Sequence, residues 1–435
     1  MDAPARTRNY LFLQGMPTLF FAGLGRALRA NGHAVHRINF TGGDRLYWPL
    51  RGAVDYRDTL QNWPAFLEGR LKQWRVTDIV LFGDWRPLHA AAIRVARLLG
   101  IAVHVFEEGY LRPHWVTLEQ GGVNNNSALP RNADWYRAQA ARLPEWQGET
   151  AIESSFLLRA VLDVTYHVTS LLTAWRYPGY RSHLPLNPFR EYWGWIGRFR
   201  RRGRNARDTA ASLGALAVHK GPIFVFPLQL DTDSQLRINS DFGRQSPAIR
   251  MVLESFARHA PQDAQLVIKE HPFDPQLDNW HGQIMAQADA LGIASRIAYL
   301  TGGDLNVLIA HSRGLVTVNS TSGILALAQG APVIALATPV YAMPGLTFQD
   351  GLDRFWREAS PPDAVLFDAF RRVLAHRTQI NGGFFSWQGL RHAVAGAVDR
   401  LEAVSLEPVL VAVPKAMPRP ANSEPVLACT PGAAN

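Results

Sequence analysis

Short apolar segments alternate with amphipathic segments in two separate parts of the sequence, and this alternation limits the fold more than any other feature. Apolar runs that end at charged or glycine residues predict strands, and apolar residues at a spacing of three or four predict helices. In the first part, these patterns predict strands at residues 9–14, 34–39, 78–82 and 101–106, and helices at 17–30 and 87–99. Strands that alternate with helices in this way form a parallel α/β sheet.

A second set of the same kind begins at Gly221. It predicts strands at residues 223–226, 265–269, 297–299, 314–318 and 332–336, and helices at 247–259, 276–291, 304–310 and 323–329. We therefore expect two Rossmann-like halves in tandem. Right-handed crossovers would turn the carboxyl ends of both sheets toward a shared cleft, which is where open α/β sheets bind ligands.

The length of 435 residues fits two domains better than one. We predict a first domain at residues 1–215, with a helical insertion at about 134–208 on one side of it, and a second domain at 216–380. A C-terminal helix at 381–406 is expected to pack back onto the body. Residues 407–435 are rich in Pro, Ala and Val without a helical or strand period, and they predict a disordered tail.

The charge balance predicts an anionic partner. Lysine and arginine outnumber the acids by 45 to 36, which gives a net charge of +9 and a pI of about 9.9. Phosphates, anionic sugars and anionic lipid headgroups suit such a surface. We do not expect nucleic acid to be a partner, because the sequence lacks the motifs that recognise it.

The sequence predicts chemistry without a metal or a cofactor. The single cysteine, Cys429, lies in the C-terminal tail, and no group of residues has metal-ligand spacing. The first residues do not form a secretory signal, and the apolar stretch at 156–175 is interrupted by Arg159, Asp163 and His167. We therefore expect a cytoplasmic protein without a membrane span.

Two adjacent acids follow the strand predicted at 101–106. Glu107 and Glu108 precede Gly109 and Arg112, so at least one carboxylate should reach the ligand cleft. Neighbouring carboxylates disfavour each other's ionisation, which suits a general acid or base. In the alternative interpretation one Glu pairs with Arg112 and the other is solvated.

The loop after the first strand of the second half carries Gln229, Asp231 and Asp233. An Asp in this place can stabilise a developing oxocarbenium charge or attack an anomeric carbon. The alternative is a turn that caps the following helix.

Lys269 and His271 lie at the end of the strand predicted at 265–269, just before Pro272. The lysine offers a charge to a phosphate, and the histidine can donate to a phosphate or a leaving group. A histidine held in the core is the alternative.

The segment at 318–323 connects a predicted strand to the first turn of a helix. Its hydroxyls and free backbone N–H groups suit a phosphate or a carboxylate, although ordinary capping of the helix explains the same residues. The residues concerned are Asn319, Ser320, Thr321 and Ser322. Gly15, after the first strand, would allow a ligand close to the backbone, and an ordinary strand-to-helix turn is its alternative.

The segment at 190–202 mixes aromatic rings with arginines, which is the composition of an interfacial segment. We expect contact with a membrane surface through Trp193, Trp195, Arg200, Arg201 and Arg202. The alternative is a solvated helix face beside a core cluster.

Four of these motifs, in this order, resemble those of the KpsS/LipB-type capsule polysaccharide biosynthesis and export proteins. They lie at 106–112, 227–235, 269–272 and 318–323, and the resemblance extends from about residue 10 to about residue 401. It implies a GT-B-like fold and a retaining transferase that moves β-linked Kdo from CMP-Kdo. The implied acceptor is a lyso-phosphatidylglycerol-type lipid at the inner face of the inner membrane, where a Kdo linker begins a capsule chain.

The resemblance also implies roles for individual residues. Asp233 matches the nucleophile, with Asp231 as the other candidate, Glu108 matches the base for the acceptor, and His271 would contact the donor phosphate. The family often has Glu-Asp-Gly where this chain has Glu107-Glu108-Gly109. Residues expected to bind the substrate or the nucleotide are Gly15, Arg112, Gln229, Lys269, Asn319, Ser320, Thr321 and Ser322.

Two other functions fit the same features. One is a non-catalytic capsule assembly or export factor that binds acidic glycan at the inner membrane, alongside other capsule proteins. The other is a transferase with a different donor, such as a sialyl or UDP-linked sugar.

Overall fold

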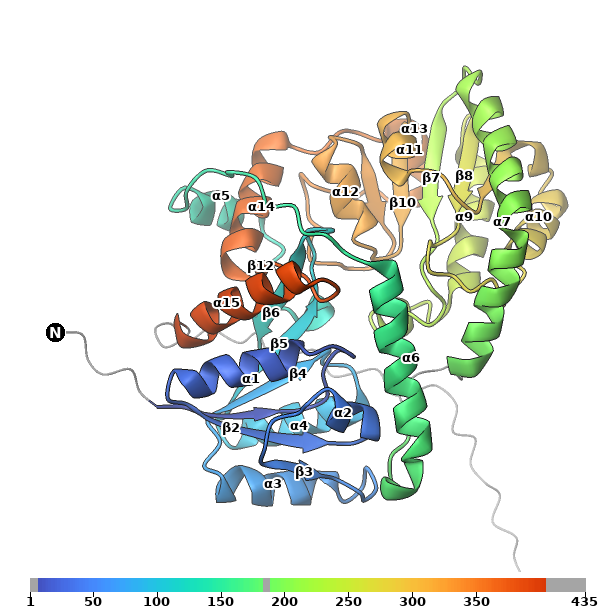
Figure 1. The fold of residues 1–435 in the computed structure, drawn as a ribbon. Coiled ribbons are helices and arrows are strands. Elements are labelled where there is room, and N and C mark those ends of the chain that lie inside the picture. Colours follow the sequence, from blue (N-terminus) through green and yellow to red (C-terminus); the bar gives the residue numbers. More distant parts are fainter. Residues whose placement is uncertain (1–6, 183–187, 404–435) are drawn as a thin grey trace, which may run out of the picture.

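The computed structural model describes residues 7–182 and 188–403. Within them the chain forms two α/β units, one above the other in Figure 1. The tail predicted at 407–435, together with Cys429, lies outside the described residues. The two Rossmann-like units confirm the GT-B-like fold class, although the first sheet departs from the predicted all-parallel pattern.

The first sheet has seven strands in the order β12-β6-β5-β4-β1-β2-β3. Its parallel part contains β1 (Asn9–Phe12), β2 (Ala34–Asn39), β3 (Ala53–Asp55), β4 (Asp78–Phe82) and β5 (Ala102–Glu108). The edge strands β6 (Trp115–Gln120) and β12 (Gln379–Asn381) run antiparallel to their neighbours. The sheet is therefore mixed, because a hairpin of six residues joins β5 to β6 and is too short for a parallel crossover.

Both faces of the first sheet are covered, which is why its strands are continuous apolar runs. Tyr10 and Phe12 of β1 point into a core shared with α1 (Phe20–Ala30) and α15 (Trp387–Ala403). Leu11 and Leu13 point into the opposite core, shared with α3 (Trp63–Gln73) and α4 (Pro87–Leu98). The short helix α2 (Gly42–Leu46) completes this unit.

The second sheet has five parallel strands in the order β11-β10-β7-β8-β9. They are β7 (Ile223–Pro227), β8 (Gln265–Lys269), β9 (Ile297–Leu300), β10 (Gly314–Thr317) and β11 (Val333–Ala335). The associated helices are α8 (Ser234–Arg237), α9 (Gln245–His259), α10 (Trp280–Ala290), α11 (Leu305–Ala310), α12 (Ser322–Ala328), α13 (Leu352–Glu358) and α14 (Ala364–Arg377).

Residues 134–208, which follow the first sheet's strand β6 in the sequence, were predicted to form helices on one side of the first domain. The structure contradicts this prediction, because these helices do not all pack on the first unit. These helices are α5 (Ala133–Ala140), α6 (Phe156–Leu172) and α7 (Pro188–Ala217). Only α6 packs on the first unit, against α2, whereas α5 packs on α14 and α7 packs on β9. Leu213 and Leu216 hold α7 there because they join the core of the second sheet.

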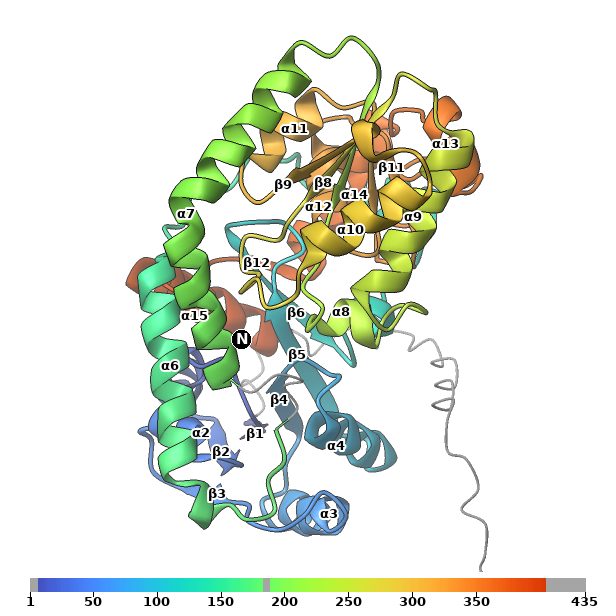
Figure 2. The same cartoon turned by 90° about the vertical axis from the view of Figure 1, so that its right-hand side faces the viewer.

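The chain returns to the first unit at its C-terminal end. Strand β12 pairs with β6, although the predicted second domain extended to residue 380. Helix α15 then packs against α1, and a side-chain nitrogen of Arg8 donates to the carbonyl of Leu401 at 3.0 Å. The first unit is thus built from both ends of the described chain (Figure 2).

Candidate active site

Glu107 and Glu108 are the last two residues of β5, so their side chains point to opposite faces of the strand. The structure gives them opposite electrostatic states. Burial raises the pKa of Glu107 to about 8, and the Glu108 charge adds to this, while the Glu108 N–H that donates to Glu107 opposes it. Burial acts on Glu108 in the same direction, but Arg112 and Arg159 outweigh it and lower the pKa of Glu108 to about 2.

Two guanidiniums hold the Glu108 carboxylate. Arg112 Nη1 lies 2.7 Å from Glu108 Oε2, and Arg159 Nη1 lies 3.1 Å from Glu108 Oε1. The pair with Arg112 is the alternative considered from the sequence, but Glu107 is half-buried rather than solvated. The Arg159 contact was missed, because α6 brings this residue to the site from 51 positions away. The available signal was that Arg159 is the only basic residue apart from His167 in α6.

The unusual pKa of Glu107 predicts a pH-dependent stability. A carboxyl with a pKa of about 8 in the folded state holds its proton more tightly there than in the unfolded chain. The fold is therefore most favoured at acid pH, and this contribution is lost as the pH rises from the ordinary pKa of a glutamate, 4.5, toward 8. We expect Glu107→Gln to gain melting temperature relative to the wild type on going from pH 5 to pH 8.5. Glu145→Gln, at an exposed position, is the control, and parallel curves for wild type and Glu107→Gln would contradict the assignment.

The loop after β7 separates the two candidate nucleophiles. Asp231 Oδ1 accepts the backbone N–H of Gln245, the first residue of α9, at 2.8 Å, so this residue caps a helix. Asp233 Oδ1 accepts the N–H of Gln235, the second residue of α8, at 2.9 Å, so the helix-capping alternative considered from the sequence is also present. Burial raises the pKa of Asp233, opposed by this N–H, by Gln229 and by Arg112. Both aspartates thus accept a backbone N–H at the start of a helix, and Asp233 in addition lies within reach of the charges of Arg112 and Glu108.

His271 follows β8 and is half-buried. Its Nδ1 accepts the N–H of Phe273 at 3.1 Å, so the proton of the neutral ring is on Nε2. Burial, together with Arg112 and Lys269, lowers the pKa of His271 to about 4. The ring is therefore neutral near pH 7 and offers a single N–H donor from Nε2.

These groups lie close enough for their charges to act on one another. The charges of Glu108, Arg112, Arg159 and Lys269 all shift the pKa of His271. Glu108 and Arg112 also act on Asp233. The structure thus brings the three predicted catalytic residues together with Arg112 and Lys269, from the ends of β5, β7 and β8.

Gln229 and Asn319 connect this cluster to the end of β10. Gln229 Nε2 donates to Asn319 Oδ1 at 2.9 Å, and the Asn319 N–H donates back to Gln229 Oε1 at 3.2 Å. Asn319 Nδ2 donates to the carbonyls of Gln235 and Asn239. Both side chains are therefore occupied in holding the Asp233 loop in place.

The turn at Ser320 to Ser322 continues from Asn319. Ser320 Oγ accepts the N–H of Ser322 at 3.2 Å, and Tyr341 donates to the Ser320 carbonyl. Thr321 is the N-cap residue of α12, but its side chain does not cap the helix. Ser322 Oγ is buried and has no hydrogen-bond partner among the described residues. The predicted anion-binding role of this turn remains a prediction.

Gly15 follows β1 and packs beside the core that contains Phe21. A Cβ at this position would lie 2.7 Å from the Phe21 ring, so the tight contact that requires glycine is with the core. The Gly15 carbonyl accepts from Arg86 at 3.3 Å. Its predicted contact with a ligand remains untested.

The loop after His271 is attached to α7. Arg198 Nη1 lies 2.8 Å from Glu270 Oε1, and Tyr299 and Gln276 donate to the same carboxylate at 2.7 Å. Phe273 stacks on Phe156 of α6, with ring centroids 5.9 Å apart. Both connecting helices therefore reach the site.

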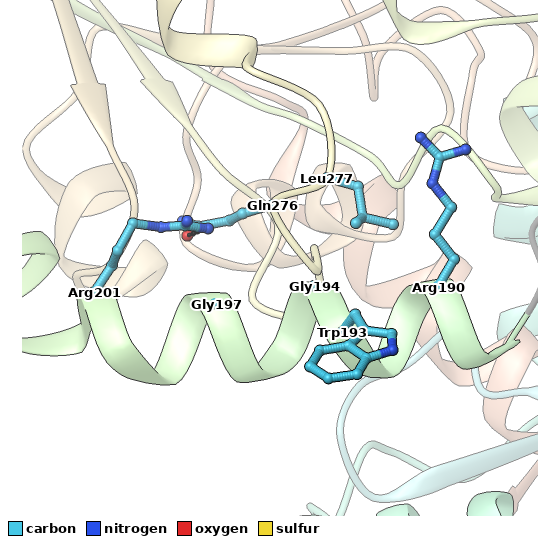
Figure 3. A pocket seen from close by; sticks show the side chains of 7 residues that line it. All are labelled: Arg190, Trp193, Gly194, Gly197, Arg201, Gln276 and Leu277. Carbon is cyan, nitrogen blue, oxygen red and sulfur yellow. Dashed lines mark hydrogen bonds between the residues drawn. The ribbon is translucent and has the colours of Figure 1, made fainter.

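The residues of the segment predicted to contact a membrane differ in their exposure and surroundings. Trp193 is 72% exposed, whereas Trp195 is half-buried between Phe156 and Phe199. An open groove runs along α7, with Arg190 and Arg201 at its two ends and Gln276 and Leu277 along one side (Figure 3). Arg202 lines a second groove, which faces residues 301–303.

Among residues 7–182 and 188–403, no helix is both long and apolar enough to cross a bilayer. In the same residues, no group of three or more His, Cys, Asp and Glu side chains is arranged to hold a metal ion.

The fold and the site define a class of protein, namely a GT-B-like α/β protein with a cluster of carboxylate, imidazole and guanidinium groups between two Rossmann-like units. Residues 77–385 match the family model described as capsule polysaccharide biosynthesis protein. The chain belongs to this family. The resemblance inferred from the four motifs is thereby confirmed.

Individual relatives agree with the family match. The chain is 36% identical over 384 residues to the capsule polysaccharide modification protein LipB of Neisseria meningitidis serogroup A, covering 87% of this chain and 92% of LipB. It is 33% identical over 381 residues to the capsule polysaccharide export protein KpsS of Escherichia coli, covering 87% and 97%. Among solved structures, it is similar to the KpsC beta Kdo 2,7 transferase of Thermosulfurimonas dismutans, with a TM-score of 0.43, 15% identity, and coverage of 91% and 99%.

Proposed function

We propose that this protein is a metal-independent, retaining glycosyltransferase of capsule polysaccharide biosynthesis. It transfers β-linked Kdo from CMP-Kdo to a lyso-phosphatidylglycerol-type lipid on the inner face of the inner membrane. The observation that carries the proposal is the convergence of Asp233, Glu108 and His271 with three cationic side chains between the two units. The cations suit a donor that carries both a phosphate and a carboxylate.

Asp233 supplies the nucleophile. One of its carboxylate oxygens attacks the anomeric carbon, and the bond from that carbon to the phosphate oxygen breaks, so that CMP leaves with the electron pair. The acceptor hydroxyl then displaces Asp233 from the sugar and transfers its proton to Glu108, the predicted base. Two displacements at one carbon retain the anomeric configuration.

The surrounding groups stabilise the leaving phosphate. His271 donates from Nε2 to a phosphate oxygen, because its Nδ1 is held by the Phe273 N–H. Lys269 and Arg112 add positive charge on the same side, which substitutes for the charge of a metal ion. Glu108 keeps Arg112 and Arg159 in position. Its predicted role as base requires that an acceptor first separates it from one of these guanidiniums.

Nucleotide binding tests the proposal. Purified protein with CMP-Kdo and a lyso-phosphatidylglycerol analogue should give a Kdo adduct that is detectable by mass spectrometry. CMP alone, at about 100 times its Kd, should raise the melting temperature by roughly 2–4 °C through ligand linkage. UDP at the same concentration should have a smaller effect.

A non-catalytic assembly or export factor predicts the opposite result. The Escherichia coli relative is named an export protein, and this name supports the alternative. Such a factor would bind acidic glycan, form no adduct and show no response to CMP. An equal or larger response to UDP would instead indicate a transferase with a UDP-linked donor.

A further inference from the structure

The outward face of α6 is an uninterrupted apolar stripe. Leu157, Leu172 and Trp175 are 72%, 71% and 78% exposed. Between them, at a spacing of three or four residues, lie other exposed apolar side chains, namely Val161, Val164, Val168 and Leu171. The structure describes the whole of α6, and none of its 17 residues is buried. A soluble helix normally presents polar side chains on this face.

The opposite side of α6 is packed closely against the first unit. A Cβ on Gly43 would lie 2.5 Å from the Tyr166 ring, and one on Gly42 would lie 1.9 Å from Thr173 Oγ1. Tyr166 also accepts from Gln14 Nε2 at 2.8 Å. The exposure of the stripe is therefore a property of a firmly attached helix.

Helix α7 continues the same surface. It runs beside α6, since Tyr192 donates to Asp163 at 3.3 Å and the rings of Trp195 and Phe156 lie 5.5 Å apart. Figure 2 shows both helices along one side of the molecule. Exposed apolar side chains on the first turns of α7 are Phe189, Trp193, Ile196 and Phe199. We call these residues and the α6 stripe the apolar ridge.

Arginines surround one end of the apolar ridge. Residues 189–207 contain seven arginines and a single acid, Glu191. Arg198 is paired with Glu270, and Arg204 is paired with Asp208, which follows this stretch; the six arginines other than Arg198 are exposed. An apolar surface beside a cluster of guanidiniums, with exposed tryptophans, matches the apolar interior and the anionic headgroups of a lipid leaflet. A protein partner would not require so one-sided a charge.

We infer that the apolar ridge docks this protein on an anionic lipid leaflet, with α6 lying in the plane of the interface. The sequence interpretation placed the contact only at 190–202, whereas the structure makes α6 its main apolar part. The stripe begins at Phe156 and Leu157, within one helical turn of Arg159, which binds Glu108. The link between this surface and the site rests on the proposed function. A lipid acceptor in the leaflet then reaches the site along the first turn of α6.

Vesicle binding tests this inference. We expect Val161→Asp/Val168→Asp to reduce the fraction bound to phosphatidylglycerol-containing vesicles by roughly tenfold or more, because both changes place charge in the apolar layer. The control Leu98→Asp/Val365→Asp alters side chains that are 87% and 73% exposed on α4 and α14, and it should bind like the wild type. The triple change of Arg200, Arg201 and Arg202 to Ser should weaken binding and reduce its salt dependence.

The possible outcomes of these assays are distinguishable. Wild-type binding by Val161→Asp/Val168→Asp overturns the inference, and so does a wild-type dimer that this variant converts to a monomer, because the ridge would then cover a second copy. With a short-chain, water-soluble acceptor, the variant should transfer Kdo at the wild-type rate. If neither the wild type nor any variant transfers Kdo, but Val161→Asp/Val168→Asp loses vesicle binding and Leu98→Asp/Val365→Asp does not, the proposed function fails and the docking surface stands.

Discussion

Asp233→Asn is expected to abolish sugar transfer, with kcat reduced by at least roughly 1,000-fold, because an amide oxygen cannot form the covalent sugar intermediate. The change should leave the fold intact. Asp233 Oδ1 accepts the N–H of Gln235, and the Asn oxygen can accept the same bond. CMP should therefore still raise the melting temperature of the variant. Single-turnover assays with CMP-Kdo would measure the loss.

Asp231→Asn is the matched control. Its oxygen would still accept the N–H of Gln245 and cap α9, so transfer should stay within about threefold of the wild type. A variant pair with the opposite activities would assign the nucleophile to Asp231. The pH profile adds a second check: because burial raises the pKa of Asp233, the acid limb of the wild-type profile should lie above the ordinary range of an Asp.

Gly109→Ala is expected to cause the largest loss of stability among single changes near the site. A Cβ on Gly109 would lie 2.3 Å from the carbonyl oxygen of Trp115, which belongs to the backbone and cannot rotate away. The same carbonyl accepts the Gly109 N–H at 3.0 Å. We expect a loss of about 3 kcal/mol in the free energy of unfolding, at the upper end of the usual cost of overpacking.

Gly69→Ala provides the comparison. Gly69 lies inside α3, and an added Cβ would meet no atom within 4 Å. This change should stabilise the protein by about 0.5–1 kcal/mol through helix propensity. Urea denaturation of both variants measures the difference. If Gly109→Ala and Gly69→Ala unfolded at the same urea concentration, the close contact between β5 and β6 would be wrong.

The regular part of the fold was accessible from the sequence. The predicted strands at 78–82 and 265–269 agree with β4 and β8 to the residue, because each contains a run of apolar residues beside polar ones. The motif at 106–112 also lies where it was predicted, at the end of β5. Local pattern was sufficient for these elements, since burial on both faces leaves a continuous apolar signal.

Elements that depend on distant contacts were not accessible. Strand β12 is three residues long, contains Gln379 and Asn381, and pairs with a strand more than 250 positions earlier. The antiparallel β6 was missed in the same way, since no local period distinguishes its direction. Helix α7 was placed on the wrong unit because the sequence does not show that Leu213 and Leu216 reach the second core.

The candidate site, too, was predictable from the sequence only where it depends on local pattern. The sequence located Glu108, Asp233 and His271 at or after strand ends, but it could not separate Asp231 from Asp233, because the choice depends on which of them lies near Arg112 and Glu108 in space. The sequence also could not show that Glu108 forms ion pairs with two arginines, since Arg159 comes from α6, which is distant in the sequence. The exposed stripe of α6 was equally hidden, because an apolar helical period is the same for a core helix and a surface helix.

The use of both chain ends in the first unit sets an order for folding during synthesis. Strands β7 to β11 of the second sheet lie within residues 223–335, so they can pair as soon as this stretch has left the ribosome. The N-terminal sheet, although made first, must wait for β12 and α15, and until then Leu24 and Leu28 of α1 lack their cover. The first unit therefore cannot complete its core until the described chain has been made almost to its end, and an incomplete core of this kind attracts chaperones.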